Sequence, residues 1–513
     1  MKSTFVHAVA LITIFAAATR AIGFIFRIFL SRILGPELLG VYQIALSFFM
    51  VFVTIVASGL PLIISKETAA LKTNENDPKA YRKAVLSLTM AGLFLSLVMS
   101  AIICVIVLGG HMLFRELFTD QRSMQILMVL IPSTLAYSVY TTLRAVWWGE
   151  KRFMLLGITE LAEQILRVIS FVVLFAFAFL FVDLAKVAAL SYLVAIVLSA
   201  ILVTIIFLRG RREKQAIKAE KIQLEIRPQI KPLLKSSTPI TTVRMLASIA
   251  LPIIAITIPA RLVASGWTRT MAISHFGIMV GMTLPLLTIP QTVISSIATA
   301  LVPELSAAVQ NKQHDQVRSK IIGCIKFTLL VNFLLLPVFM AVGHGIGTFL
   351  FDNEYAGVYL VRSAWVMIPI SLSQITNTIL NSMGAETKAM KNYIVGSVFL
   401  FASIWFLPEH MGVDALIVGI GLCMTIASVL NLILISRLTG VNTNILNSTL
   451  IFAAFSLPAI LAGAFIYGIM SNFFTNFFAT GFGGATSVLV IAGLAYMFNM
   501  VDLKSIRRNR DDS

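Results

Sequence analysis

The chain has 513 residues, of which 58% are apolar and 12% are charged, and its formal net charge is +17. A mean hydropathy of +0.92 leaves too little polar surface for a soluble globule, so the composition predicts a polytopic membrane protein. Most Lys and Arg residues lie in short segments between apolar runs, where they act as topology signals, and we therefore expect no nucleic-acid partner.

The first apolar segment, residues 8–34, is long enough to cross a bilayer, yet it contains Arg20, Arg27 and Arg32. A helix of about 20 apolar residues spans the hydrocarbon core, and an arginine at its centre costs about 2.5–3.5 kcal/mol on insertion scales. We therefore expect Arg20 and Arg27 to face protein or water. Arg32 lies near the end of the segment, so we expect its side chain to reach the membrane interface.

Arg20 and Arg27 are seven residues apart, so their side chains project from one face of a helix, about 10 Å apart along its axis. A guanidinium group is always charged and can bind two phosphate oxygens at once. The pair therefore favours recognition of a phosphorylated substrate inside the membrane. The alternative is that these two side chains also reach the interface.

Fourteen apolar segments of spanning length recur along the chain, and Lys and Arg concentrate in the even-numbered connections between them. By the positive-inside rule these connections are cytoplasmic. An even number of helices with both termini in the cytoplasm follows. The predicted crossings are residues 8–34, 41–65, 84–109, 123–147, 156–181, 184–208, 237–260, 274–302, 321–350, 358–382, 391–407, 413–436, 448–470 and 481–500.

The sixth connection, residues 209–235, is long and basic, and similar sequence recurs on either side of it. Ile131-Pro132 and Ile368-Pro369 are each followed by Thr, Gly and Lys around the fourth helix of their half. We predict a six-helix unit duplicated in the same orientation, and parallel-repeat transporters place substrate between such halves; a chance match is the alternative. The predicted parts are a first lobe (1–208), a cytoplasmic linker (209–235), a second lobe (236–437), two further helices (438–503) and a basic cytoplasmic tail (504–513).

Few other ionisable residues fall within the predicted crossings, and each is a functional candidate by default. Glu163 and Arg167 are four residues apart, which favours an ion pair inside the bundle; a role in a cavity is the alternative. Arg144, beside two tryptophans near a helix end, is either an interfacial anchor or a cavity residue. Arg261 flanks a short outer connection against the positive-inside pattern, which indicates a role other than topology.

The sequence lacks features that several other functions require. No His, Cys or Asp cluster has metal-ligand spacing, no GxxxxGK[ST] loop occurs, and no insertion is long enough for a catalytic domain. The first segment also has no Asp or Glu, which a proton-coupled exporter of cationic drugs would be expected to use. We therefore predict a transporter of anionic cargo, with no catalytic residue, metal site or cofactor, and leave a coupling cation open.

Six stretches carry a family resemblance: TRAIGFIFRIFLSRILGPELLGVYQIA (19–45), SGLPLIISKETA (58–69), LRAVWWGEKR (143–152), ELAEQILRVI (160–169), IPARLVASG (258–266) and PLLTIPQTVISSIATALVPELS (285–306). Together they resemble the stage V sporulation protein B group of the MOP (multidrug/oligosaccharidyl-lipid/polysaccharide) flippase superfamily, which is related to the lipid II flippase MurJ. The resemblance covers the first twelve predicted helices. It implies an all-α fold of fourteen transmembrane helices, with two six-helix lobes around a central cavity and two extra C-terminal helices.

The resemblance also implies a function, namely movement of an undecaprenyl-pyrophosphate-linked sugar to the outer leaflet. Cationic cavity residues would bind the pyrophosphate, and the last two helices would form a groove for the lipid tail. Arg20 matches the first conserved arginine of the MurJ pattern, whereas Arg27 falls one position later than the second. The acidic residue and arginine of the MurJ second helix are missing from the run 41–60, and the arginine of the eighth helix is absent, with Arg261 as the nearest substitute.

Three functions remain as hypotheses. The first is a flippase for a lipid-linked peptidoglycan precursor such as lipid II, in cell-wall or spore-cortex synthesis, working by alternating access. The second is a flippase for another lipid-linked repeat unit, of exopolysaccharide or teichoic type, and the third is a polytopic glycosyltransferase, which the short outer loops disfavour. We expect a monomer in the cytoplasmic membrane that binds a lipid-linked saccharide through Arg20, Arg27, Arg144, Glu163, Arg167 and Arg261.

Overall fold

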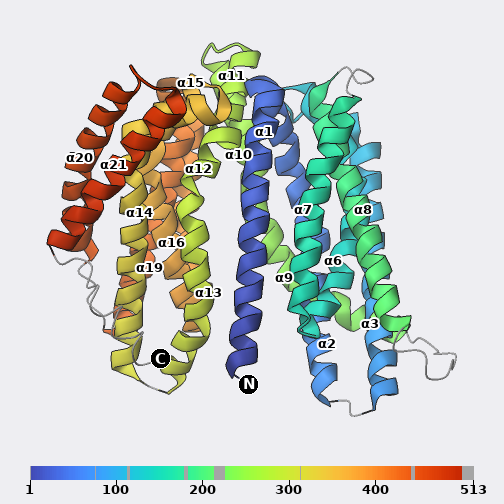
Figure 1. Ribbon diagram of the computed structural model, residues 1–513. Coiled ribbons are helices and arrows are strands. Elements are labelled where there is room, and N and C mark those ends of the chain that lie inside the picture. The colour runs from blue at the N-terminus through green and yellow to red at the C-terminus, as the bar shows by residue number, and fades with distance from the viewer. Residues whose placement is uncertain are drawn as a thin grey trace. The chain divides into compact units, whose positions relative to one another are not determined.

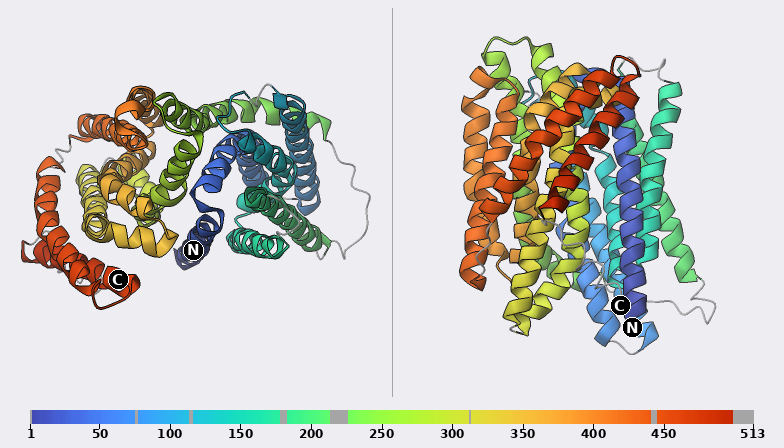
Figure 2. Two further views of the ribbon diagram at one scale, coloured as in Figure 1. Left: turned by 90° about the horizontal axis from the view of Figure 1, so that it is seen from above. Right: turned by 60° about the vertical axis from the view of Figure 1, so that its left-hand side comes forward.

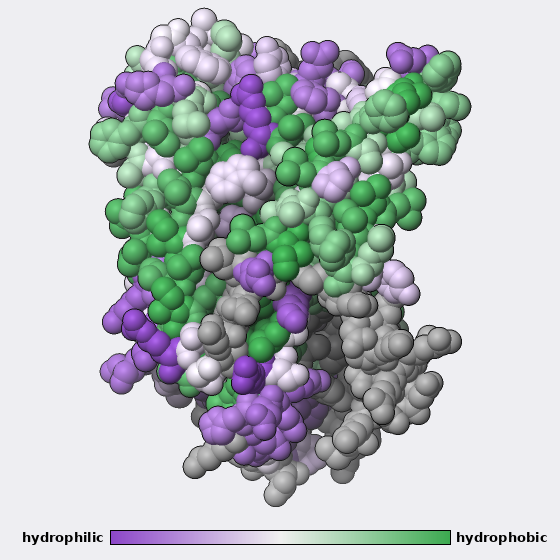
Figure 3. All heavy atoms as spheres, turned by 90° about the vertical axis from the view of Figure 1, so that its left-hand side faces the viewer, coloured by the Kyte–Doolittle hydropathy of each residue, from purple (hydrophilic) through white to green (hydrophobic). Residues whose placement is uncertain are grey.

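A computed structural model of the protein describes residues 2–74, 77–112, 116–177, 183–212, 226–311, 313–440 and 445–498. Within these residues the regular secondary structure is helical throughout (Figure 1). Figure 3 shows one face of the molecule, on which hydrophobic residues gather in a band between more hydrophilic ends. The predicted class, an all-α polytopic membrane protein, is confirmed.

The described helices fall into two units. Unit 1 comprises Met1–Ala260 and Thr268–Gly277, and unit 2 comprises Arg261–Trp267 and Ile278–Ser513. The helices of unit 1 are α1 (Lys2–Ala57), α2 (Gly59–Asn74), α3 (Pro78–Gly109), α5 (Gln121–Leu130), α6 (Ser133–Gly149), α7 (Phe153–Ala176), α8 (Leu184–Arg212), α9 (Arg227–Ser248), most of α10 (Ala250–Ala264), and α11 (Arg269–Gly277).

Unit 2 is built around the long helix α14, against which α20 and α21 both pack (Figure 1 and Figure 2). Helices α16, α17 and α19 pack against one another and form a second group in this unit. The elements of unit 2 are η3 (Ile278–Thr283), α12 (Leu284–Leu287), α13 (Ile289–Gln310), α14 (His314–Phe351), α15 (Glu354–Ser363), η4 (Ala364–Val366), α16 (Met367–Ser382), α17 (Glu386–Phe406), α18 (Pro408–Met411), α19 (Asp414–Thr439), α20 (Ile445–Met470) and α21 (Asn476–Met497).

The number of membrane crossings differs from the predicted fourteen. The described residues contain 11 helices long and apolar enough to cross a membrane, or 12 if the bent pair of α5 and α6 forms one span, so the count of fourteen is not confirmed. One reason is that the 60-residue span Ile14–Thr73 counts once, although α1 is interrupted within it at Gly35. Another is that α7 contains three charged residues, Glu160, Glu163 and Arg167, so it does not count among the helices that are apolar enough to cross a membrane.

The interruption of α1 lies at Gly35, whose backbone has φ 67° and ψ 173°. Pro36 follows, and proline disfavours the helical conformation in the residue before it, while glycine reaches positive φ without a steric penalty. Beyond the break, α1 packs against α11. A Cβ atom at Gly40 would lie 2.2 Å from the backbone oxygen of Ile273, and one at Gly277 would lie 2.4 Å from that of Pro36, so both positions need glycine for this close approach.

Each of the two Ile-Pro pairs lies at or near an irregularity in the helix that contains it. In unit 1 the chain bends by 44° between α5 and α6, where Pro132 precedes α6. In unit 2 the short 3₁₀ helix η4 separates α15 from α16, and Pro369 lies in the first turn of α16. The irregularity in unit 2 therefore precedes its Ile-Pro pair, and Glu354–Ser382 counts as one span, so the duplication stays a prediction.

The two units meet at other residues than the predicted linker, 209–235, and the predicted division into two lobes stays a prediction. The described helix α9 belongs to unit 1 because it packs against α1, α2 and α3. Its approach to α2 is close, since a Cβ atom at Gly59 would lie 2.4 Å from the backbone oxygen of Ser237. Helices α8 and α9 extend into the predicted linker from both sides, while residues 213–225 and the predicted tail, 504–513, lie outside the described residues.

Candidate substrate-binding site

The arginines of the first crossing lie on an unbroken part of α1. The helix is continuous up to Gly35, so Arg20 and Arg27 lie two turns apart on one face, and both side chains are exposed, as is that of Arg32. This part of α1 packs against α7. A Cβ atom at Gly23 would lie 3.3 Å from the side-chain nitrogen of Gln164, a buried residue of α7.

Arg167 of α7 is held from two sides. It forms the predicted ion pair with Glu163, and the exposed fractions of the two side chains are 25% and 14%. Its guanidinium carbon also lies 4.6 Å from the centroid of the Tyr192 ring on α8, a distance at which the ring face attracts a cation. Within the described residues, the Nε atom of Arg167 is buried and has no hydrogen-bond partner.

Arg144 of α6 is held in a similar way. It donates hydrogen bonds to the hydroxyl of Tyr140 at 2.8 Å, to the backbone oxygen of Leu156 at 3.0 Å and to a carboxylate oxygen of Glu160 at 3.2 Å. The side chain is 15% exposed, which favours an interior role over that of an interfacial anchor. Its buried Nε atom likewise has no hydrogen-bond partner among the described residues.

Tyrosines connect these two arginines. The rings of Tyr137 and Tyr140 are 6.1 Å apart, and Tyr137 interacts electrostatically with both arginines and with both of their glutamate partners. The buried Tyr42, on the second part of α1, interacts with Arg27 as well as Arg167. We call this set the arginine–tyrosine cluster; its members are Arg27, Tyr42, Tyr137, Tyr140, Arg144, Glu160, Glu163, Arg167 and Tyr192.

Sequence reasoning missed the tyrosines and the pairing of Arg144 with Glu160. One signal was available, because Tyr137, Tyr140 and Arg144 are spaced by three and four residues and so share one helix face. Tyr192 carried no such signal, since it comes from another helix. The structure brings four of the six predicted residues into the arginine–tyrosine cluster, namely Arg27, Arg144, Glu163 and Arg167.

Arg261 belongs to unit 2 and has its own partners there. It forms an ion pair with Glu409, donates a hydrogen bond from Nε to the backbone oxygen of Trp405 at 2.9 Å, and lies 5.2 Å from the centroid of the Trp405 ring. These contacts attach the end of α10 to α17 and α18. The structure therefore gives Arg261 a packing role, and its assignment to the substrate remains a prediction.

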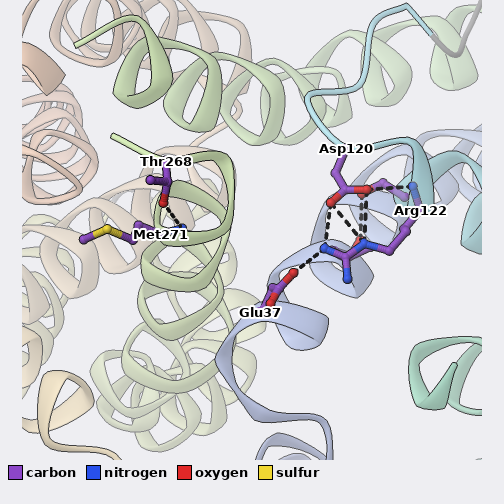
Figure 4. A network of polar contacts seen from close by, with 7 residues as sticks. Glu37, Asp120, Arg122, Thr268 and Met271 are labelled. Carbon is purple, nitrogen blue, oxygen red and sulfur yellow. Dashed lines mark hydrogen bonds and ion pairs between the residues drawn. The ribbon is translucent and has the colours of Figure 1, made fainter. Parts of the chain in front are cut away.

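A further ionic network, also missed from sequence, joins two of the predicted outer connections (Figure 4). Arg122 forms ion pairs with Asp120, at 2.8 Å, and with Glu37 of α1. Asp120 also caps α5 by accepting a hydrogen bond from the Arg122 backbone nitrogen at 2.8 Å. Burial raises the pKa of Asp120, but the hydrogen bonds from Arg122 outweigh burial and hold the pKa below its ordinary value of 3.8.

The arginine–tyrosine cluster offers cations, carboxylates and phenols at one place in unit 1. Guanidinium groups and phenol hydroxyls donate hydrogen bonds to phosphate oxygens, so the arrangement suits an anionic, phosphate-bearing group. In the part of the chain that the structure describes, no group of three or more His, Cys, Asp or Glu residues could hold a metal ion.

Comparisons with known proteins identify the family of the chain. Residues 5–309 match the family described as "Polysaccharide biosynthesis protein". The chain is 22% identical over 471 residues to stage V sporulation protein B of Bacillus subtilis, covering 90% of this chain and 89% of that protein. It is 21% identical over 476 residues to the sporulation protein YkvU of the same organism, covering 90% and 97%.

Solved structures show the same fold. The structure titled "Lipid II flippase MurJ, inward closed conformation" has a TM-score of 0.63 at 14% identity and covers 96% of this chain and 100% of that chain. An inward-facing multidrug resistance transporter of the MATE family has a TM-score of 0.64 at 15% identity, covering 82% and 94%. The resemblance seen in the sequence is therefore confirmed: the chain belongs to the polysaccharide biosynthesis protein family and has the fold of MOP superfamily transporters.

Proposed function

We propose that the protein is a flippase that moves an undecaprenyl-pyrophosphate-linked saccharide across the cytoplasmic membrane by alternating access. The observation that carries the proposal is the arginine–tyrosine cluster, in which the Nε atoms of Arg144 and Arg167 are buried donors without a partner among the described residues. Leaving such a donor unsatisfied costs about 1–3 kcal/mol. A pyrophosphate oxygen would satisfy each donor, so substrate binding would recover this cost.

The glutamates of the cluster give a reason for release. Glu160 and Glu163 already bind Arg144 and Arg167, so a pyrophosphate must compete with a carboxylate for each guanidinium group. Exchange between two anions keeps the net gain on binding small, because the arginine loses one charge-assisted contact when it forms another. A flippase needs this moderate affinity, since its cargo has to leave on the other side.

Arg20 and Arg27 supply the second part of the proposed site. Both are exposed on α1, and Arg27 is linked to Arg167 through Tyr42. We propose that Arg20 attracts the pyrophosphate and that Arg27 passes it to the other residues of the arginine–tyrosine cluster. The termini and the connection between α8 and α9 would then be cytoplasmic, as the distribution of Lys and Arg predicts.

Within this class we propose a peptidoglycan precursor such as lipid II as the cargo. The names of two similar proteins, a lipid II flippase and a sporulation protein, support this choice. The family description, which refers to polysaccharide biosynthesis, supports the second candidate, a different lipid-linked repeat unit. Both cargoes share the pyrophosphate and differ in the sugar.

The test is transport in proteoliposomes that contain the purified full-length protein. A fluorescent undecaprenyl-pyrophosphate disaccharide-pentapeptide and an undecaprenyl-pyrophosphate repeat unit without peptide would be compared, with a fluorescent phosphatidylcholine as the control lipid. We expect protein-dependent flipping of the first cargo and none of the control. Preference for the second cargo would select the alternative, and absence of flipping for both would refute the proposed function.

A further inference from the structure

A cavity lies in unit 1, among the ends of α3, α6, α7 and α8, and has a volume of about 600 Å³. None of the residues of the arginine–tyrosine cluster lines it. Its lining contains Lys79, Arg82, Arg152 and Arg209 but a single carboxylate, that of Glu150. These helix ends adjoin the second, fourth and sixth connections, which the positive-inside rule places in the cytoplasm.

The charge on this lining is positive. The lining contains four basic side chains and one carboxylate, and that carboxylate, Glu150, is ion-paired with Arg152 at 2.8 Å. Pro78 and Lys79 also line the cavity and lie in the first turn of α3, whose N-terminus is capped by the Asp77 side chain. A cavity of this volume is within the range of small-molecule sites, and its charge suits a phosphate group.

Part of the cavity wall is apolar and buried. Trp147 and Phe207 both line the cavity, are 2% and 5% exposed, and pack with their ring centroids 6.5 Å apart. Val85 at the start of α3 is buried beside them. The cavity therefore combines a basic rim with an apolar wall, as expected for a group that is anionic at one end and apolar at the other.

An exposed apolar stripe runs along another face of α8 to the helix end that lines this cavity. Leu198, Ile201, Ile205 and Leu208 are 42%, 50%, 42% and 53% exposed, and their spacing of three and four residues puts them on one helix face. The stripe ends beside Arg209, which lines the cavity. In a helix that spans a membrane, such a stripe faces the acyl chains of the bilayer.

We propose that this cavity binds the phosphate headgroup of an anionic membrane phospholipid, whose acyl chains lie along the apolar stripe of α8. Basic pockets between transmembrane helices on the cytoplasmic side are suited to such headgroups. The stripe is what favours a lipid over a soluble phosphate. The bound lipid would join the ends of α3, α6, α7 and α8, and its binding is independent of the cargo that the protein transports.

The test compares lipid binding by the purified full-length protein and by charge variants. Phosphatidylglycerol would be titrated into protein in phosphatidylcholine nanodiscs or mixed micelles, and retained lipid would be counted by native mass spectrometry, alongside the unfolding temperature. The test variant is Arg82→Gln with Arg209→Gln. The matched control is Lys388→Gln with Arg437→Gln, which removes two exposed charges from unit 2.

We expect wild type and the control to retain phosphatidylglycerol and to unfold at a higher temperature when it is present. The test variant should bind it about thirtyfold more weakly, from the loss of two basic residues near an anionic headgroup. The single variant Arg209→Gln, at an exposed helix end, should bind phosphatidylglycerol about fivefold more weakly than wild type. It provides the test if the double variant does not fold.

Three results would overturn the proposal. Equal loss of binding in the test and control variants would show that phosphatidylglycerol binds through non-specific electrostatic attraction to the protein surface and not in this cavity. Stabilisation by glycerol phosphate or inorganic phosphate as strong as that by the lipid would identify a site for a soluble anion. Displacement of phosphatidylglycerol by undecaprenyl pyrophosphate, abolished in the test variant, would make the cavity a loading site for the transported cargo.

Discussion

Arg167 and Tyr192 form a cation–π contact in which the guanidinium carbon lies 4.6 Å from the ring centroid. The same guanidinium group is paired with Glu163, so an aromatic face from α8 and a carboxylate from α7 restrain it together. Such a restraint positions the cation while leaving its Nε donor available, because neither contact uses that atom.

Glu163→Gln should destabilise the protein, because the amide keeps the shape of the carboxylate and removes its charge. The pair is largely buried, with Glu163 14% exposed, and losing a charge-assisted hydrogen bond there costs about 1–3 kcal/mol. Glu160→Gln is the matched control; Glu160 is 49% exposed, and an exposed pair contributes about 0–1 kcal/mol. Thermal unfolding in detergent measures both, and equal effects would show that burial of the Glu163 pair is unimportant.

Arg20→Ala should abolish transport and leave the protein folded. A charge within a membrane-spanning helix carries an insertion cost, so its removal is not expected to weaken the bundle. Flipping in proteoliposomes and the amount of protein in the membrane fraction would be measured together. An inactive variant that also fails to accumulate would make Arg20 a structural residue.

Arg20→Lys and Arg27→Lys should each impair transport although the charge is kept. Lysine cannot bind two phosphate oxygens in the planar, forked geometry of arginine. Loss of one charge-assisted hydrogen bond should weaken cargo binding about tenfold to a hundredfold. The rate of flipping would be measured as a function of cargo concentration for the lysine variants, the alanine variants and wild type. If the lysine variants were as active as wild type while the alanine variants were inactive, electrostatic attraction alone would be sufficient for binding.

Gly40→Ala should destabilise unit 1 where α1 meets α11. The new Cβ atom would lie 2.2 Å from the backbone oxygen of Ile273, a backbone atom that cannot move away as a side chain can. Overpacking of this kind costs about 1–3 kcal/mol. Gly493→Ala in α21 is the control, because its Cβ atom would meet nothing within 4 Å; the control should unfold at the wild-type temperature or slightly above it.

Asp120→Asn should reduce stability in a pH-dependent manner. The pKa of Asp120 is lower in the folded protein than its ordinary value of 3.8, so its stabilisation is fully present above that value and is lost as the pH falls through the folded pKa. Asparagine is also a good N-cap, which isolates the effect of charge. The unfolding temperatures of variant and wild type should differ at pH 6, and the difference should shrink only as the pH falls below 3.8 and through the lower folded pKa of Asp120. A difference that stays constant over this range would exclude the charge as the cause.

Apolar runs and charge spacing predicted a large part of this structure. The runs 8–34 and 41–65 correspond to the helices on either side of Gly35, since a membrane-spanning backbone must satisfy its hydrogen bonds within a helix. The ion pair of Glu163 and Arg167 followed from their spacing on one helix, and the structure confirms it.

Contacts between different helices could not be predicted in the same way. Arg144 meets Glu160 from α7, and Arg167 meets Tyr192 from α8, and a single sequence does not show which faces of two helices pack together. The boundary of unit 1 was also not readable, because it depends on the packing of α9 against three other helices. The arginines were therefore predictable as candidates, and their partners were not.

During synthesis, α7 has to enter the bilayer with Glu160, Glu163 and Arg167 in its sequence. A charged residue near a helix centre raises the free energy of membrane insertion by about 2.5–3.5 kcal/mol on insertion scales. Insertion of α7 alone from the translocon into lipid is therefore unfavourable. Arg144 on the preceding helix pairs with Glu160, and Tyr192 on the following helix covers Arg167. We therefore expect α6, α7 and α8 to leave the translocon as a group, with α7 retained until α8 has been made.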